Sequence, residues 1–194
     1  MTLKEKAYAI GFDLATGLSE SKTSTKRHLA DMKKIFNHVE LLEDSIQKGN
    51  NHMVYEYYSV DADVPKTDGD LHFGTSVVYP GKVGDEYYMT KGHFHEVLET
   101  GEVYLCLSGE GYMLMENPEG DWQIEKFIPG QAVHVPPRYA HRSINIGNEP
   151  LVTFFTFRAD AGHDYGTIET KGYRKLVVEK DGQPEIIDNP NWEQ

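Results

Sequence analysis

The sequence predicts an all-β fold, a single small antiparallel barrel or sandwich with short helices at its N-terminal end. Three observations lead to this prediction. The 194 residues suit one domain, because globular domains run to about 100–200 residues. From Met53 onward the chain consists of short runs rich in Val, Tyr, Phe and Thr. Turn sequences such as SGEG, NPEGD and GNEP separate these runs, and no helical pattern lies between them.

The first 52 residues are expected to decorate the barrel and not to form a second domain. Within residues 21–36, Ser24 is a candidate N-cap, and apolar residues recur at helical spacing. These residues are Leu29, Met32, Ile35 and Phe36. Within residues 37–50, Leu41, Leu42 and Ile46 form a second apolar stripe, and Gly49 follows it as a stop signal. Two short helices are therefore expected.

The expected strands follow in order. They cover residues 53–60, 73–80, 85–90, 102–108, 111–116, 122–128, 132–135 and 151–157, and a further run begins at His141. Two more runs, 174–180 and 184–188, lie in the tail. We therefore predict a decorating segment over 1–52, a barrel over 53–165, and C-terminal strands and a tail over 166–194 that pack on the same domain.

The charge balance restricts the partners of this protein. It has 31 acidic and 19 basic side chains, a formal net charge of −12. Nucleic acid requires a basic face, so the composition argues against it. No apolar run approaches the roughly 20 residues of a membrane span, and the start of the chain lacks a secretion signal. We expect a cytoplasmic protein in which Cys106, the single cysteine, forms no internal disulfide.

Three of the nine histidines are spaced like metal ligands. His93 and His95 are two residues apart, and on a strand such residues point to the same face. Glu102 begins the next predicted strand, and His141 follows a Pro-Pro turn at the start of another. Three imidazoles and one carboxylate on facing strands suit a divalent transition metal, without selecting among iron, zinc, nickel, copper and manganese.

These residues resemble the two motifs of the cupins, G-x5-H-x-H-x3,4-E-x6-G and G-x5-P-x-G-x2-H-x3-N. The matching residues are His93, His95, Glu102 and Gly109 in the first motif and Pro136, His141 and Asn145 in the second.

Two positions depart from these motifs. The generic spacing selects Glu99 as the carboxylate, but its x6-G register ends on Cys106, whereas Glu102 leads to Gly109. We therefore prefer Glu102 and keep Glu99 as the alternative. Arg138 stands where the second motif has glycine, which would bring a cation close to the mouth of the site.

A narrower resemblance covers most of the chain. The stretches YPGKVGDEYYMTKGHFH, GEVYLCLSGEGYMLM, VPPRYAHRSINIGNEP and FRADAGHDYGTI closely resemble the cupin-type glucose-6-phosphate isomerases of archaea and some bacteria. This resemblance implies that His93, His95, Glu102 and His141 hold one metal ion per subunit. The ion would be iron, Fe(II), with manganese, nickel or zinc as alternatives.

The same resemblance implies a substrate pocket for a sugar phosphate. Thr90 and Gly92 would help to bind the sugar phosphate. The other residues implied to line the pocket are Tyr55, Tyr104, His163 and Tyr165. Ser76 stands where the family has a phosphate-contacting threonine, so the hydroxyl is kept and the methyl group is lost.

Aldose–ketose isomerisation moves hydrogen between C1 and C2, which requires a base for the proton beside the carbonyl. Glu102 is the only carboxylate that the motifs direct into the barrel, so it is the candidate proton carrier, and Tyr104 on the same face is a candidate hydrogen-bond donor. A metal-bound carboxylate is a weak base, because the cation lowers its pKa. Two routes therefore stay open: Glu102 leaves the metal when substrate binds, or hydrogen moves as a metal-assisted hydride shift.

Two other functions stay open: a metal-dependent cupin dioxygenase, which uses the same ligand set, and a non-catalytic sugar-binding cupin, which would not need all four ligands. The hydroxyls of Thr90 and Ser76 and the GHDYG loop favour the isomerase over the dioxygenase. The presence of all four ligand residues favours it over a non-catalytic protein. Because cupins commonly pair by sharing strands, we also expect a homodimer.

Overall fold

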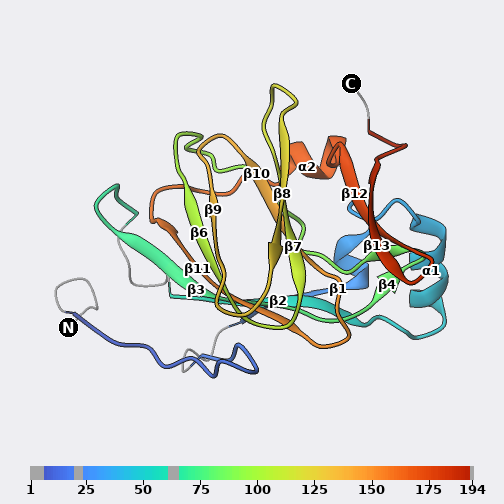
Figure 1. Cartoon of the computed structure of the whole chain (residues 1–194), viewed down its shortest axis with the longest axis horizontal. Coiled ribbons are helices and arrows are strands. Elements are labelled where there is room, and N and C mark those ends of the chain that lie inside the picture. Colours follow the sequence, from blue (N-terminus) through green and yellow to red (C-terminus); the bar gives the residue numbers. More distant parts are fainter. Residues whose placement is uncertain (1–6, 20–23, 61–65, 193–194) are drawn as a thin grey trace.

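Antiparallel strands in three sheets form the framework of the computed structural model, which describes residues 7–19, 24–60 and 66–192 (Figure 1). A six-stranded sheet contains, in spatial order, β1 (Ser24–His28), β2 (Met53–Ser59), β3 (Leu71–Val78), β11 (Leu151–Arg158), β6 (Glu102–Ser108) and β9 (Ala132–Val135). A three-stranded sheet contains β10 (Ala140–Asn145), β7 (Gly111–Glu116) and β8 (Trp122–Phe127). A four-stranded sheet contains β13 (Gln183–Asp188), β12 (Lys175–Lys180), β5 (Glu86–Tyr87) and β4 (Lys82–Val83). The predicted all-β fold is confirmed.

The N-terminal segment differs from the prediction. Ser24 is not a helix cap but the first residue of β1, and it pairs with Tyr58 of β2. The hydrogen bonds of this segment therefore go to a distant strand, which local helical spacing cannot reveal. Only a 3-10 turn, Leu29–Met32, follows, and residues 21–23 of the predicted helix lie outside the described residues. The second predicted helix is present as α1 (Val39–Gln47).

The segment between β5 and β6 lies along β10. The predicted strand over 85–90 is regular only in β5, and the chain then bonds to the edge of β10. The amide of Thr90 donates to Ser143 O at 2.9 Å, and the amide of Asn145 donates to Tyr88 O at 3.0 Å. These bonds fix the stretch that leads to His93 beside β10.

A short helix not expected from the sequence, α2 (Gly166–Lys171), precedes β12. Asp164 lies just before it, and its Oδ1 accepts a hydrogen bond from the amide of Gly166 at 2.9 Å. Such a contact satisfies one of the free N–H groups at a helix start. In the described part of the chain no helix is long and apolar enough to cross a membrane.

Strand register decides which side chains face the interior of the barrel. Residues directly opposite each other on paired strands share a face. One such row is His72, Phe157 and Glu102, and the next is Gly74, Phe155 and Tyr104. The cross-strand rows therefore set aromatic rings beside Glu102 and Tyr104.

Close backbone approaches at two glycines allow this arrangement. A Cβ atom on Gly74 would lie 1.8 Å from Tyr58 O, so no larger residue fits between β2 and β11. Gly109 has φ 81° and forms the turn between β6 and β7, as predicted. A Cβ atom there would lie 2.4 Å from Pro150 O. Both positions therefore require glycine. Gly74 is required because no space is left for a side chain, and Gly109 is required for that reason and for its positive φ.

Candidate metal centre and active site

The four predicted metal-binding side chains come from three parts of the barrel. Glu102 is the first residue of β6, and His141 lies in β10. His93 and His95 lie on an extended segment that forms only isolated bridges, His93 with His141 and Phe94 with Asp164. The regular strand assumed for this pair is therefore absent, but the amide of His141 donates to His93 O at 3.2 Å and holds the segment close to β10.

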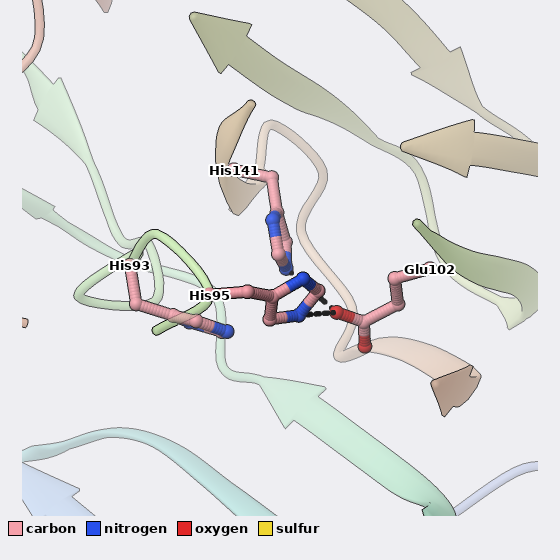
Figure 2. Close-up of side chains that lie close together, drawn as sticks. All are labelled: His93, His95, Glu102 and His141. Atoms are coloured by element: carbon pink, nitrogen blue, oxygen red, sulfur yellow. Dashed lines mark hydrogen bonds and ion pairs between the residues drawn. The ribbon is translucent and has the colours of Figure 1, made fainter. Parts of the chain in front are cut away.

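The ligand atoms of these four residues converge (Figure 2). One nitrogen or oxygen from each of His93, His95, Glu102 and His141 lies within 4.8 Å of every other. Glu102 Oε2 is 2.9 Å from His141 Nε2 and 3.2 Å from His95 Nε2. His95, Glu102 and His141 are buried, and His93 is half-buried.

A hydrogen bond on the far side of the ring orients His95. Its Nδ1 is 3.0 Å from Thr100 O, and because a carbonyl only accepts, Nδ1 is the donor. In a neutral imidazole Nε2 then carries a lone pair, which faces the carboxylate of Glu102. Two lone pairs so close together repel each other, and a proton or a cation between His95 Nε2 and Glu102 Oε2 would remove this repulsion. A metal-binding histidine is typically held in this way by a partner on its other nitrogen.

His93 provides the second sign that the cluster fits a cation. Its Nε2 is buried and has no hydrogen-bond partner in the described structure. Burial lowers the pKa of His93 well below its usual value, and His141, His163 and His95 lower it further. The ring is therefore neutral, which is the form that binds metals.

The carboxylate of the cluster is ionised. Burial by itself raises the pKa of Glu102, but His141 and His95 outweigh burial and lower the pKa to about 2. A buried carboxylate beside three imidazoles is a donor set for a divalent transition metal.

Glu99, the alternative carboxylate, lies outside the cluster. Its side chain is 72% exposed, whereas that of Glu102 is 1% exposed. Glu99 Oε1 instead lies 3.5 Å from Arg138 Nη1, and Arg138 also pairs with Glu119. Arg138, expected close to the mouth of the site, is not among the described residues that line the cavity described next. Its φ of 72° explains why this position of the motif is usually glycine.

A cavity of about 240 Å³ opens above the cluster. All the residues expected at a substrate pocket line this cavity: Tyr55, Ser76, Thr90, Gly92, Tyr104, His163 and Tyr165. The sequence interpretation missed a further set that lines it too: Tyr57, Ser59, Ser143, Phe155 and Phe157. His72 of β3 is also in the lining. The alternation of Tyr55, Tyr57 and Ser59 along β2 was the available signal, because every second residue of a strand shares a face.

The side chains around the cavity are mostly neutral. Burial lowers the pKa of His163 to about 4 and raises the pKa of Tyr55 to about 12. Burial also raises the pKa of Tyr104 well above its usual value, and the nearby Glu102 raises it further. The His163 and Tyr165 rings stack with centroids 5.8 Å apart. The cavity therefore offers hydroxyl groups and uncharged imidazoles beside one ionised carboxylate.

A small antiparallel barrel that holds three histidines and one glutamate at these motif positions defines a cupin. The family model described as "Glucose-6-phosphate isomerase (GPI)" matches residues 26–193. The chain therefore belongs to the glucose-6-phosphate isomerase family, and its enzyme class is that of these isomerases.

Curated relatives agree over nearly the whole chain. The glucose-6-phosphate isomerase of Pyrococcus furiosus is 43% identical over 188 residues, which cover 97% of this chain and 98% of the relative. The enzyme of that name from Thermococcus litoralis is also 43% identical, over 97% of each chain. The one from Sinorhizobium medicae is 34% identical and covers 99% of this chain and 90% of its own.

Solved structures resemble parts of the barrel. Oxalate oxidase in complex with the substrate analogue glycolate has a TM-score of 0.49 and 13% identity, over 59% of this chain and 56% of its own. Oxalate decarboxylase from Bacillus subtilis has a TM-score of 0.45 and 26% identity, over 56% of this chain and 26% of its own.

Proposed function

We propose that this protein interconverts glucose 6-phosphate and fructose 6-phosphate in a reaction that depends on a divalent metal. The observation that carries the proposal is the convergence of three imidazoles and one carboxylate beneath a hydroxyl-lined cavity. Membership of the isomerase family supports the substrate pair. We further propose that the enzyme is cytoplasmic, serves glycolysis and gluconeogenesis, and acts as a homodimer.

His93, His95, Glu102 and His141 would hold the metal. The partnerless Nε2 of His93 and the facing lone pairs of His95 and Glu102 support this role. Imidazole with one carboxylate oxygen suits Fe(II), which we propose as the native ion, and also suits Mn(II), Ni(II) or Zn(II). When bound, such an ion supplies a Lewis acid for the oxygens at C1 and C2 of the sugar.

Glu102 is the proposed proton carrier. In the direction of fructose 6-phosphate, its carboxylate would take the proton from C2 and return it to C1. The hydroxyl proton at O2 would pass to O1, so that the carbonyl moves from C1 to C2. Tyr104 would keep the carboxylate oriented, because its hydroxyl interacts with Glu102 and stays protonated. The competing route is direct hydride transfer between the two carbons, in which Glu102 carries no hydrogen.

The remaining pocket residues would bind the sugar and its phosphate. Ser76 and Thr90 contribute hydroxyls to the lining, and Gly92 lets the chain pass close to the ligand. The rings of Tyr55, His163 and Tyr165 form part of the wall, where their polar ends can bind sugar oxygens. The rings of Phe155 and Phe157 in the lining would help to keep water from the reacting carbons.

The experiment that tests this function measures conversion of fructose 6-phosphate to glucose 6-phosphate before and after chelator treatment. We expect the chelated protein to lose activity and to regain it with Fe(II), Mn(II), Ni(II) or Zn(II), added singly. Circular dichroism on the same samples verifies that the chelated protein remains folded. A folded protein with no isomerase activity in any metal would refute the proposal, and full activity after complete metal removal would refute its metal dependence.

A further inference from the structure

The cavity has no strong cation for the phosphate group of the proposed substrate. A phosphate monoester is largely a dianion at neutral pH. Proteins commonly bind such groups with arginine, lysine or the start of a helix. None of the described residues that line the cavity is a lysine or an arginine. If the proposed function holds, on which this inference rests, the charge must come from the edge of the cavity.

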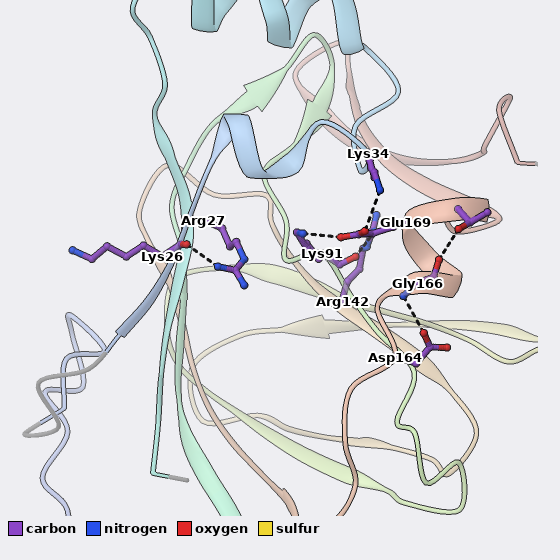
Figure 3. A network of polar contacts seen from close by, with 9 residues as sticks. Lys26, Arg27, Lys34, Lys91, Arg142, Asp164, Gly166 and Glu169 are labelled. Carbon is purple, nitrogen blue, oxygen red and sulfur yellow. Dashed lines mark hydrogen bonds and ion pairs between the residues drawn. The ribbon is translucent and has the colours of Figure 1, made fainter. Parts of the chain in front are cut away.

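Arg27 of β1 lies at that edge. In the pairing of β1 with β2, Arg27 stands opposite Tyr55, and Thr25 stands opposite Tyr57. Opposite residues share a face of the sheet, and both tyrosines line the cavity, so Arg27 is on the cavity side. Lys26 stands opposite Glu56 on the other face. Figure 3 shows the side chains of Lys26 and Arg27 pointing away from each other.

Within the described structure, the guanidinium of Arg27 forms no ion pair. Its Nη1 donates to Lys26 O at 3.1 Å, and the guanidinium also hydrogen-bonds the side chain of Tyr55, so several of its five N–H groups stay available. The side chain is half-buried, so the charge is not simply a solvated surface charge. Three other arginines each pair with a carboxylate, and a fourth, Arg142, is buried against the Tyr173 ring with Glu86 and Glu116 in its field. The paired arginines are Arg138, Arg158 and Arg174.

The surroundings of Arg27 favour an anion at this end of the cavity. Burial raises the pKa of Tyr55 and of Tyr165, and the positive charge of Arg27 opposes the rise at both hydroxyls, so Arg27 is electrostatically close to both rings. Nearby, Lys91 Nζ lies 2.7 Å and Lys34 Nζ 3.6 Å from the carboxylate of Glu169 (Figure 3). Two cations thus share one anion, and Lys91 is the neighbour in sequence of Thr90 and Gly92, which line the cavity.

We propose that Arg27 binds the phosphate group of the sugar phosphate and so selects phosphorylated over free sugars. The guanidinium can offer two parallel N–H groups to two phosphate oxygens, a geometry that lysine does not reproduce. The phosphate lies away from C1 and C2, so Arg27 would bind it equally strongly in the ground state and in the transition state. Such uniform binding changes KM and leaves kcat nearly constant.

Arg27→Met tests this role in the metal-loaded enzyme, because methionine keeps an unbranched apolar stem and removes the charge. We expect KM for fructose 6-phosphate to rise about ten- to hundredfold, the usual loss for one charge-assisted contact, with kcat nearly unchanged. Arg27→Lys should recover part of the loss. Lys26→Met is the matched control, since it removes a charge from the neighbouring residue on the opposite face, and it should leave KM unchanged. An unchanged KM in Arg27→Met, or an equal rise in both methionine variants, overturns the proposal.

A binding experiment separates this inference from the isomerase function. Calorimetry measures the affinity for 6-phosphogluconate and for gluconate, which differ in the phosphate group. We expect Arg27→Met to weaken 6-phosphogluconate binding about ten- to hundredfold and to leave gluconate binding unchanged. If Arg27→Met loses affinity equally for both ligands, or loses affinity for neither, the role of Arg27 is refuted even if the wild type is an active isomerase. Conversely, selective loss supports it even if turnover is absent, in which case only the proposed reaction fails. A melting curve of each variant verifies folding, and Arg27→Lys preserves the test if Arg27→Met unfolds.

Discussion

Replacing the carboxylate of the candidate metal centre tests both the choice of Glu102 over Glu99 and its proposed role. Glutamine has nearly the shape of glutamate but cannot accept a proton on its amide at neutral pH. The side chain of Glu102 is 1% exposed and has Oε2 at 2.9 and 3.2 Å from two imidazole nitrogens. Loss of a positioned acid–base group costs about 10²–10⁴-fold in rate, so Glu102→Gln should lower kcat by that factor.

Glu99→Gln is the matched control for this change. The Glu99 side chain is 72% exposed, and its ion pair with Arg138 lies outside the cavity. Exposed ion pairs contribute little, so Glu99→Gln should retain the kcat and KM of the wild type. Both variants are compared in an assay that couples glucose 6-phosphate formation to its oxidation, with metal content measured on the same samples.

The metal measurement distinguishes two consequences of Glu102→Gln. If the variant keeps its metal and loses turnover, the carboxylate acts on the substrate, as proposed. Deuterium from solvent should then enter the product of the wild type, because a proton held by a carboxylate exchanges with water. Equal kcat losses in Glu99→Gln and Glu102→Gln would show that the carboxylate was chosen wrongly. Undiminished kcat in metal-loaded Glu102→Gln would refute Glu102 as proton carrier and leave the hydride route.

Two further predictions concern the scaffold of the site. Gly74→Ala should fold poorly and melt well below the wild type, because its Cβ would lie 1.8 Å from Tyr58 O and 2.9 Å from the Phe155 ring. A melting temperature within about 2 °C of the wild type, where 1 kcal/mol corresponds to about 2–4 °C, would contradict this reasoning. Arg138→Gly should melt at a higher temperature than Arg138→Ala, since both variants lose the ion pairs but only glycine adopts φ 72° without strain. The opposite order would mean that the left-handed conformation is not strained at this position.

The sequence predicts most of the strands because their signal is local. Alternation of side chains along β6 directs Glu102 and Tyr104 to one face and Val103 to the other, and the burial along this strand follows the same pattern. The turn at Gly109 is equally local, since it depends on a left-handed glycine between two β runs. The motif register that ends on this glycine also favoured Glu102 over Glu99, and Glu102 is the one whose carboxylate faces the histidines.

Other features could not be obtained from local patterns. The spacing of Leu29 and Met32 suits a helix, yet the residues before them form β1, because pairing with β2 satisfies their backbone groups. His93 and His95 converge with His141 although they lie on no regular strand, since hydrogen bonds to β10 and to Asp164 shape their backbone. Only cross-strand pairing reveals such contacts.

The sequence alone therefore determined the all-β class, the ligand residues to consider and the isomerase family that the chain resembles. These three features depend on residue types at short spacings and on motifs, which can be recognised in the sequence alone. Tertiary structure decided which side chains meet: the aromatic wall of Phe155 and Phe157, the exclusion of Glu99, and the position of Arg27 beside Tyr55. For Phe155, Phe157 and Arg27 the physical reason is strand register, because backbone hydrogen bonds between distant segments fix it and a shift of one residue would turn these side chains to the opposite face. Glu99 lies in the turn before β6, where its side chain is exposed.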